Sequence, residues 1–510
     1  MLSVAWLQSR SRRSVGLLVG GGQSFQGSNR LCRLFVVLGM AVLVAGCGET
    51  YRPVVTPVAV TGPAPQPQSY VVVTTTTGNG TPGLANIFDA SGDTLLTQAL
   101  IGNGPLSLSL SSSGTSATAV GTDGTVNTFT PSTTLQTKNV LISTLLQPAT
   151  PINLLSTTGS LFITEPNVPA VAVLSTNSSG LYRLTQELPV PASPINVAGN
   201  ANAARVYSIT QDNGSNTVTF GACENPSQVT TPGQVQSIEI STVTISRTLP
   251  VGICPVYGIG STDNTRVFIL NRGSGTVTVI NSQFNTLDTT ANLPNLTNGT
   301  LLLPPPGGVP AASFTAGPVF ADYFTPSSQL VTANYDSNTI TIINTSIDQY
   351  GNDSPLFGQA VTVPVGNGPA TLTILRDGSR VYVANQKDST ISVVSLSSYK
   401  VLATIPVTGH PISIASTYST PFGQVYVIPS DQPVMSVIRT DTDQVAAAIQ
   451  LDGVGVDVHT SAQSVAANSA TTGAVTNAIN LSHASGSGSP CGFGATCYLT
   501  SPLAASRPAK

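Results

Sequence analysis

Short runs of β-branched and aromatic residues, separated by turns rich in Gly, Asn, Asp and Ser, follow one another along most of the chain. Three stretches with this pattern align without gaps. In each, a five-residue run closes on Asn, a polar turn follows, and a second run begins five residues after that Asn. Two such runs around a short turn predict a β-hairpin. The hairpins are Val267–Asn271 with Thr276–Ile280, Leu330–Asn334 with Thr339–Ile343, and Val381–Asn385 with Thr390–Val394, and looser copies are Leu161–Glu165 with Ala170–Leu174 and Val425–Pro429 with Val434–Ile438.

A second pattern, a short apolar strand followed by a turn that ends in Pro, recurs beside the hairpins. Successive prolines of this kind are 46, 43, 61, 63, 51 and 42 residues apart. The hairpin asparagines are 63 and 51 residues apart, which equals the spacing of the corresponding prolines. The two patterns therefore belong to one four-stranded unit. Repeats of about 40–50 residues with four strands are typical of β-propeller blades. The prolines are Pro105, Pro151, Pro194, Pro255, Pro318, Pro369 and Pro411.

The prolines delimit seven blades, and residues 70–103 supply three strands of an eighth. These strands, Tyr70–Thr76, Leu84–Asp89 and Leu95–Ile101, lack an innermost partner, which Val456–Thr460 can supply. Closing a ring with strands from both ends removes free sheet edges, which promote aggregation. We therefore predict an all-β fold, a β-propeller of eight four-stranded blades over residues 70–460, with seven blades as the alternative. The proline-bounded blades are 105–150, 151–193, 194–254, 255–317, 318–368, 369–410 and 411–454.

One part of the chain resembles the YVTN-type β-propeller repeat family. The resemblance rests on Val381-Tyr-Val-Ala-Asn385, Thr390-Ile-Ser-Val-Val394, Lys400–Val407 and Gly409-His-Pro411. It extends over 319–455 and more weakly over 256–291, whereas over 70–250 only the spacing persists. The resemblance implies a bacterial secreted or surface propeller.

The N-terminus predicts export and a lipid anchor. Residues 1–46 contain five Arg and no acidic residue, and an apolar run from Leu34 to Val44 precedes Ala45-Gly46-Cys47. A basic region, a short apolar region and small residues describe a signal peptide, and Cys47 in this setting resembles a bacterial lipobox. The resemblance implies cleavage before Cys47 and its lipidation; the alternative is an ordinary signal peptide with an incidental cysteine. Residues 47–69, with five spaced prolines, are expected to form a tether.

Composition narrows the picture further. Only 8 % of residues are charged, while 40 % are hydrophobic, so the chain lacks the Glu, Lys and Arg that cover long helices. Without residues 1–46, 14 basic residues stand against 22 acidic ones, a net charge of −8. That balance argues against nucleic acid, which needs a concentrated basic face.

Four cysteines remain after Cys32 and Cys47. Cys223 lies between the middle strands of one blade and Cys254 in the linker to the next, and in a propeller both kinds of loop emerge on one face. We therefore predict a Cys223–Cys254 disulfide. A second pair, Cys491–Cys497, would close a small ring in the Ser/Ala/Gly-rich tail 461–510. The C-x-x-C spacing of thiolate metal sites does not occur, and we predict no metal or other cofactor.

Candidate binding residues lie on the same face as these loops. The hairpin asparagines have two interpretations, because Asn at a strand end either shapes the turn or contacts a ligand. Around them stand charged and aromatic side chains, and His410 lies in a linker that leads to the central channel. The candidate face comprises Asn271, Arg272, Asn334, Tyr335, Asp336, Asn385, Lys387 and His410.

Two functions fit these observations. The first is a non-enzymatic, lipid-anchored binding or scaffold module at the cell envelope, a monomer that contacts the membrane through its anchor and binds an envelope protein or a glycan. The alternative is a hydrolase of lactonase type, because some secreted propellers of similar repeat type have that activity. No motif of a catalytic nucleophile or phosphate loop occurs, so we assign no catalytic residue. The expected location is extracytoplasmic, in the outer membrane, the periplasm or at the cell surface.

Overall fold

The computed structural model describes residues 69–461 except 79–80, 112, 132–141, 146–149, 177–181, 192, 200–202, 215–217 and 418–422. The expected signal peptide, Cys47 and nearly all of the tether lie outside the described residues, as do Cys491 and Cys497. Within the described part, no helix has the length and apolar character needed to cross a membrane.

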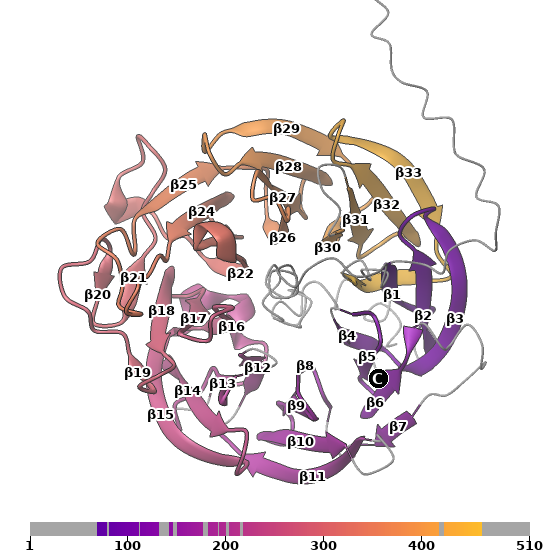
Figure 1. Cartoon of the computed structure of the whole chain (residues 1–510), viewed down its shortest axis with the longest axis horizontal. Helices are drawn as coiled ribbons and strands as arrows, with labels where there is room; N and C mark the ends of the chain where they lie inside the picture. The colour runs from indigo at the N-terminus through magenta and orange to yellow at the C-terminus, as the bar shows by residue number, and fades with distance from the viewer. Residues whose placement is uncertain are drawn as a thin grey trace, which may run out of the picture. The chain divides into compact units, whose positions relative to one another are not determined.

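Eight antiparallel sheets form a ring, so the chain is an eight-bladed β-propeller, as predicted (Figure 1). Blade 1 contains β1 (Tyr70–Thr76), β2 (Pro82–Asp89), β3 (Thr94–Asn103) and, innermost, β34 (Val454–Thr460). Blade 2 contains β4 (Pro105–Leu110), β5 (Ala117–Gly121), β6 (Thr125–Phe129) and β7 (Ile142–Leu145). Blade 3 contains β8 (Asn153–Thr157), β9 (Ser160–Glu165), β10 (Ala170–Thr176) and β11 (Tyr182–Pro189). Blade 4 contains β12 (Pro194–Ala198), β13 (Arg205–Thr210), β14 (Pro232–Glu239) and β15 (Thr244–Ile253).

The other half of the ring follows the same plan with one enlarged blade. Blade 5 contains β16 (Pro255–Gly260), β17 (Arg266–Asn271), β18 (Thr276–Asn281), β19 (Thr286–Leu287), β20 (Leu296–Thr297) and β21 (Thr300–Leu302). Blade 6 contains β22 (Pro318–Phe324), β23 (Gln329–Asn334), β24 (Thr339–Asn344) and β25 (Ala360–Pro364). Blade 7 contains β26 (Pro369–Ile374), β27 (Arg380–Asn385), β28 (Thr390–Ser395) and β29 (Val401–Pro406), and blade 8 contains β30 (Pro411–Ser416), β31 (Gln424–Pro429), β32 (Val434–Arg439) and β33 (Gln444–Gln450).

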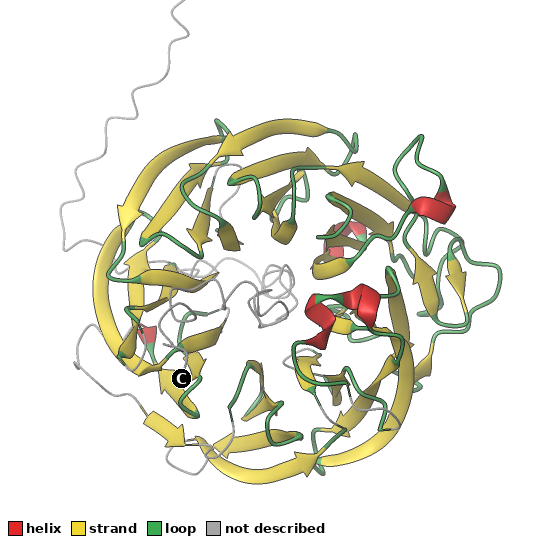
Figure 2. Cartoon of the chain, turned by 180° about the vertical axis from the view of Figure 1, so that it is seen from behind, coloured by secondary structure: helices red, strands yellow, loops and turns green. Residues whose placement is uncertain are grey.

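Short 3-10 helices lie in the connections (Figure 2). They are η1 (Ala222–Glu224), η2 (Pro226–Gln228), η3 (Ala311–Ser313) and η4 (Thr325–Ser327). The fourth strand of blade 5 is divided, because β19 and β21 each pair with a different part of β18. The residues between them form a protrusion at the rim of the ring (Figure 1).

The hydrophobic core lies between the blades. Every residue from Val381 to Ala384 in β27 is fully buried, because the two faces of the blade pack against different neighbours. Val381 and Val383 pack with residues of blade 6, while Tyr382 and Ala384 pack with residues of blade 8. Burial on both faces explains why the middle strands are continuous apolar runs and do not alternate with polar residues.

The ring closes where β34 pairs with β1, which confirms the predicted closure by both ends. Asp457 in β34 is buried and ties this blade to both neighbours. Its Oδ1 accepts a hydrogen bond from Ser413 Oγ of blade 8 at 2.9 Å, and its Oδ2 accepts one from the backbone N–H of Leu108 in blade 2 at 3.1 Å. The closing strand therefore carries a polar connection as well as backbone pairing.

Other inner strands use the same type of connection. Asn153 Oδ1 accepts from the backbone N–H of Val197 in the next blade, and Asn196 Oδ1 accepts from that of Gly258, both at 3.2 Å. Buried amide and carboxylate oxygens thus tie consecutive inner strands together, because each satisfies a backbone donor of the next blade.

A buried ion-pair cluster joins the enlarged parts of blades 5 and 6. Arg266 lies between Asp288 and Asp353, with contacts of 2.7 Å from Nε to Asp288 Oδ2 and from Nη2 to Asp353 Oδ1. All three side chains are almost completely buried. Desolvation raises the pKa of Asp353 above its ordinary value, although the Arg266 charge opposes this. The cluster fixes the insertions to the ring.

Candidate functional site: the upper face of blades 5 to 8

We call the upper face the one that carries the turn between the second and third strands of each blade and the linker to the next blade. Side-chain oxygens in these turns accept hydrogen bonds from backbone N–H groups of the linkers. Asn103 N donates to Asp123 Oδ2 at 2.6 Å, Ile253 N to Ser274 Oγ at 2.7 Å, and His410 N to Asp431 Oδ1 at 2.8 Å. The loops of this face are therefore held on the scaffold, which is the usual arrangement for binding surfaces.

The three repeat asparagines lie beneath this face and are fully buried. Each Nδ2 donates to two hydroxyls, five and seven residues further along the chain. Asn271 binds Thr276 and Thr278, Asn334 binds Thr339 and Thr341, and Asn385 binds Thr390 and Ser392, at 2.9–3.2 Å. Of their two interpretations, the structure favours the structural one, because these amides pin the ends of the hairpin.

Blade 3 differs at this position. Glu165 replaces Asn, and Ala170 and Ala172 replace the two hydroxyl residues. The Glu165 side chain is fully buried, and neither carboxyl oxygen has a hydrogen-bond partner among the described residues. Burial, aided by the charge of Glu187, raises the pKa of Glu165 to about 8, so the carboxyl group is largely protonated at neutral pH.

Four of the predicted face residues come together at the surface, and we call them the cationic face cluster: Arg272, Tyr335, Asp336 and Lys387. The Arg272 guanidinium donates to both carboxyl oxygens of Asp336, at 2.8 and 2.9 Å. The Tyr335 ring lies between the two cations, with Arg272 Cζ 5.3 Å and Lys387 Nζ 4.4 Å from its centroid. Such cation–π contacts hold all three side chains in place.

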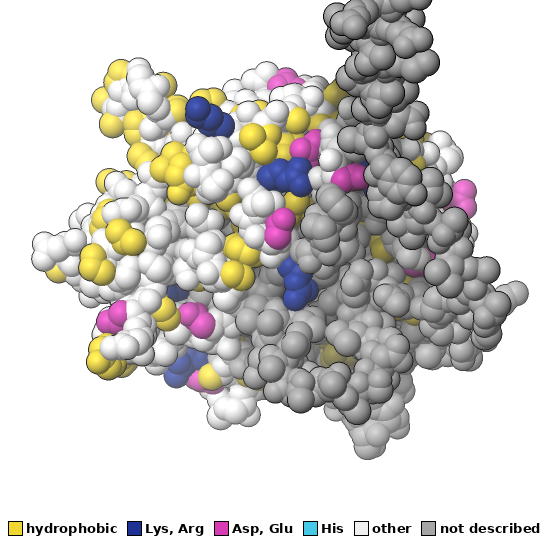
Figure 3. All heavy atoms as spheres, turned by 45° about the horizontal axis from the view of Figure 1, so that its top comes forward, with side chains coloured by type: hydrophobic (Ala, Val, Ile, Leu, Met, Phe, Trp, Pro, Cys, Tyr) yellow, Lys and Arg dark blue, Asp and Glu magenta, His cyan; other side chains and the backbone are white. Residues whose placement is uncertain are grey.

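The cluster has one carboxylate for two cations. The exposed Lys387 makes no ion pair with any described residue, whereas Arg272 is mostly buried and paired. Tyr335 is held further by its hydroxyl, which donates to Gln386 Oε1 at 3.1 Å. The surface therefore offers a fixed aromatic ring and an available positive charge. More widely, charged side chains are scattered among uncharged atoms (Figure 3).

The predicted disulfide between Cys223 and Cys254 is confirmed, with 5.5 Å between the two Cα atoms. Cys223 belongs to η1, and its backbone oxygen accepts a hydrogen bond from Arg272 Nη1 at 3.3 Å. The disulfide-bonded loop thus supports the buried side of the cluster.

His410 lies apart from these contacts and pairs with Asp431 in the turn of blade 8. Its Nδ1 is 2.9 Å from Asp431 Oδ2, and both side chains are exposed. Desolvation of Asp431 acts upward on its pKa, but hydrogen bonds from the His410 backbone and ring outweigh it and hold the pKa below its ordinary value. His410 is thus a linker residue held by Asp431 of the same blade.

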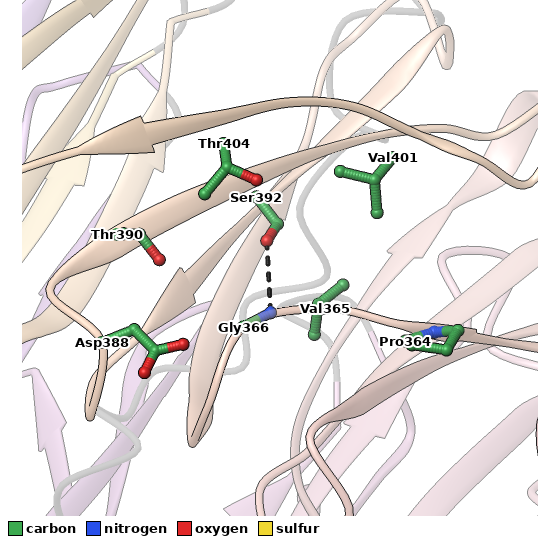
Figure 4. Close-up of a pocket in the computed structure, with 8 residues that line it drawn as sticks. All are labelled: Pro364, Val365, Gly366, Asp388, Thr390, Ser392, Val401 and Thr404. Atoms are coloured by element: carbon green, nitrogen blue, oxygen red, sulfur yellow. Dashed lines mark hydrogen bonds between the residues drawn. The ribbon is translucent and has the colours of Figure 1, made fainter.

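A groove next to the cluster was not predicted from the sequence. It lies between the linker that follows β25 and the outer strands of blade 7, with a volume of about 510 Å³ (Figure 4). Two of its hydroxyls are those that hold Asn385, and their spacing from that Asn was the only signal in the sequence. The lining residues are Pro364, Val365, Gly366, Asp388, Thr390, Ser392, Val401 and Thr404.

Metal-binding chemistry has no obvious location in this part of the chain. Among the described residues, no group of three or more His, Cys, Asp or Glu side chains is placed to hold a metal ion. The acidic pair Asp441 and Asp443 forms part of a turn, where Asp441 pairs with Arg439 and Asp443 with Arg380 of blade 7.

Comparisons with known proteins place the fold but not the family. No family model matches the chain, and no curated protein sequence matches it. Among solved structures, AztD from Citrobacter koseri is similar with a TM-score of 0.52 and 12% identity, over 77% of this chain and 97% of that one. Sqt1 from Saccharomyces cerevisiae is similar with a TM-score of 0.51 and 9% identity, over 69% of this chain and 86% of that one. The dihydro-heme d1 dehydrogenase NirN, in complex with DHE, is similar with a TM-score of 0.50 and 11% identity, over 78% of this chain and 76% of that one. At such identities the likeness shows only that the chain shares the propeller fold.

Proposed function

We propose that this chain is a YVTN-type, lipid-anchored propeller that acts as a non-enzymatic binding module at the bacterial cell envelope. The observation that carries the proposal is the cationic face cluster, in which Tyr335 is fixed between Arg272 and Lys387. Tyr and Arg are enriched among residues that dominate binding energy, above all where they are ordered before binding. The partner is an envelope protein or a glycan that presents a group for the aromatic ring and a carboxylate or phosphate for Lys387.

Two features support the proposed location, the N-terminal sequence and the disulfide. At the N-terminus, the sequence Ala45-Gly46-Cys47 provides the lipobox and residues 48–69 a spacer. In the folded part, the Cys223–Cys254 disulfide supports an oxidising compartment, because disulfides are rare in reducing cytosol. An extracytoplasmic lipoprotein satisfies both.

The test is capture of envelope components by the mature chain, with one lysine on each face of blade 7 compared. We expect Lys387→Ala to lower capture of a specific partner by about tenfold or more, because a hydrogen bond to a charged group contributes about 1.5–3 kcal/mol. Lys400→Ala is the matched control, since Lys400 is also exposed but lies at the opposite end of β28. Equal loss for both variants, or for neither, would contradict a role of the cluster. Hydrolysis of a lactone by the mature chain would instead favour the lactonase-type alternative.

A further inference from the structure

The groove of blade 7 is built from hydroxyls, one carboxylate and aliphatic side chains. Thr390, Ser392 and Thr404 project from β28 and β29, and Asp388 lies at the turn beside them (Figure 4). Val365 and Val401 complete the walls. The volume of about 510 Å³ is within the roughly 300–1,000 Å³ of small-molecule sites.

The hydrogen-bond directions determine what this lining offers. Asn385 Nδ2 donates to Thr390 Oγ1 at 3.0 Å and to Ser392 Oγ at 2.9 Å. Both hydroxyls therefore accept from Asn385, and the partly exposed Thr390 keeps its own O–H for donation to a ligand, since a hydroxyl both donates and accepts; Ser392 is buried at the floor of the groove. Asp388 supplies acceptors, and the exposed Thr404 hydroxyl supplies both functions.

A buried acceptor beneath the groove lacks a donor. Asn385 is fully buried, and its Oδ1 has no hydrogen-bond partner among the described residues. In blade 5 the linker supplies this donor, because Gly252 N donates to Asn271 Oδ1 at 3.0 Å. In blade 7 the equivalent Gly366 N points to Ser392 Oγ at 3.4 Å instead. A buried oxygen without a donor is costly, so the floor of this groove is less well satisfied than the same position in blade 5.

We infer that this groove binds a neutral pyranose unit. The inference deepens the proposed binding function and rests on it. Pyranose hydroxyls match a lining that both donates and accepts, and the C–H face of the ring matches Val365 and Val401. The lining includes no cation and one carboxylate, which opposes an anionic ligand.

The test uses D-glucose and N-acetyl-D-glucosamine as probes, with D-glucuronate as the anionic comparison, and records saturation-transfer NMR of the mature chain. We expect one neutral sugar to bind and glucuronate to bind more weakly. Thr404→Val keeps the side-chain shape but removes its hydroxyl, and should weaken binding by about fivefold, since one neutral hydrogen bond contributes about 1 kcal/mol. Val365→Trp, which fills the groove, should abolish binding.

A matched control lies in blade 4. Thr248 occupies the same place in β15, opposite Gln236, and is also exposed. Thr248→Val should leave sugar binding unchanged. Failure of both neutral sugars to bind at roughly 100 mM, or equal binding by wild type and Val365→Trp, overturns the inference. These sugar-binding results do not test the role of Lys387. The capture experiment with Lys387→Ala tests the proposed function separately.

Discussion

Blades 3 and 7 share the same hairpin yet fill its upper end with different chemistry. In blade 7, a buried Asn385 donates to the hydroxyls of Thr390 and Ser392. In blade 3, Glu165 faces Ala170 and has no partner among the described residues. The strands superimpose in register in both cases, so the hydrophobic runs alone are sufficient to form the hairpin. The polar residue at the end of the hairpin can therefore differ between blades, and it determines how the stability of each blade depends on pH.

The largest expected effect is a pH response that comes from blade 3. The folded-state pKa of Glu165 is about 8, above its ordinary 4.5, so the folded chain holds a proton that the unfolded chain releases. The stability that this proton contributes is fully present below about pH 4.5 and is lost as the pH rises toward 8, on the order of 5 kcal/mol in total. Glu165→Gln carries no such loss, so its melting temperature should fall less than that of wild type between pH 5.5 and 8.5.

Glu187 provides the control for this measurement, because its charge raises the pKa of Glu165 from β11, two strands away in the same blade. Glu187→Gln should lower the folded-state pKa of Glu165, so the loss of stability should end at a lower pH and be smaller, without disappearing. Identical pH profiles for wild type and Glu165→Gln would show that the carboxyl group is not held in its protonated form.

A leucine scan of the two positions should give effects of opposite sign. Asn385→Leu removes two hydrogen bonds and leaves the hydroxyls of Thr390 and the buried Ser392 without this donor, so it should lower the free energy of unfolding by about 2 kcal/mol. Glu165→Leu removes a carboxyl group that has no partner among the described residues, and at pH 8 it should be neutral or stabilising. Urea unfolding at this pH measures both. Similar destabilisation by the two substitutions would mean that the blades do not differ as described.

The smallest effect is expected from transplanting one chemistry into the other blade. The triple variant Glu165→Asn, Ala170→Thr, Ala172→Ser gives blade 3 the set found in blade 7. At pH 7.5 it should gain about 1 kcal/mol, because the amide acquires two acceptors. Thermal unfolding of the triple variant and of Glu165→Asn alone separates the hydroxyl contribution. If the triple variant is no more stable than Glu165→Asn, the Asn–hydroxyl set does not stabilise this hairpin.

The repeating parts of the molecule were accessible from the sequence, and the parts that depend on contacts between blades were not. Proline spacing and apolar runs predicted eight blades, and the closing strand was found because blade 1 lacked an inner partner. Its observed bounds, Val454–Thr460, begin two residues earlier than predicted. The disulfide followed from the shared face of two loops. These features depend on local pattern and fixed topology.

Polar contacts between distant parts of the chain leave no pattern in the sequence comparable to the proline spacing and the apolar runs. Arg266 occupies the same place as Arg380 at the start of a strand, yet one is buried between two acids and the other pairs with Asp443 of the next blade. The two acids that surround Arg266 lie in the long segments that follow the third strands of blades 5 and 6. The Oδ1 of Asn385 has no donor in the part of the chain that the structure describes, and this depends on where the linker of the preceding blade passes, which the repeat does not specify.

The closing strand also sets the order in which the molecule can be completed. Thr74 and Asp457 meet across the β1–β34 pair although 383 residues separate them in the chain. During synthesis or export, blade 1 must wait with an exposed strand edge until almost all of the propeller has emerged. The seven other blades have all their strands by then, so closure is a late and all-or-none event. A prematurely terminated chain would keep that edge open, where it can pair with another chain and be recognised as incomplete.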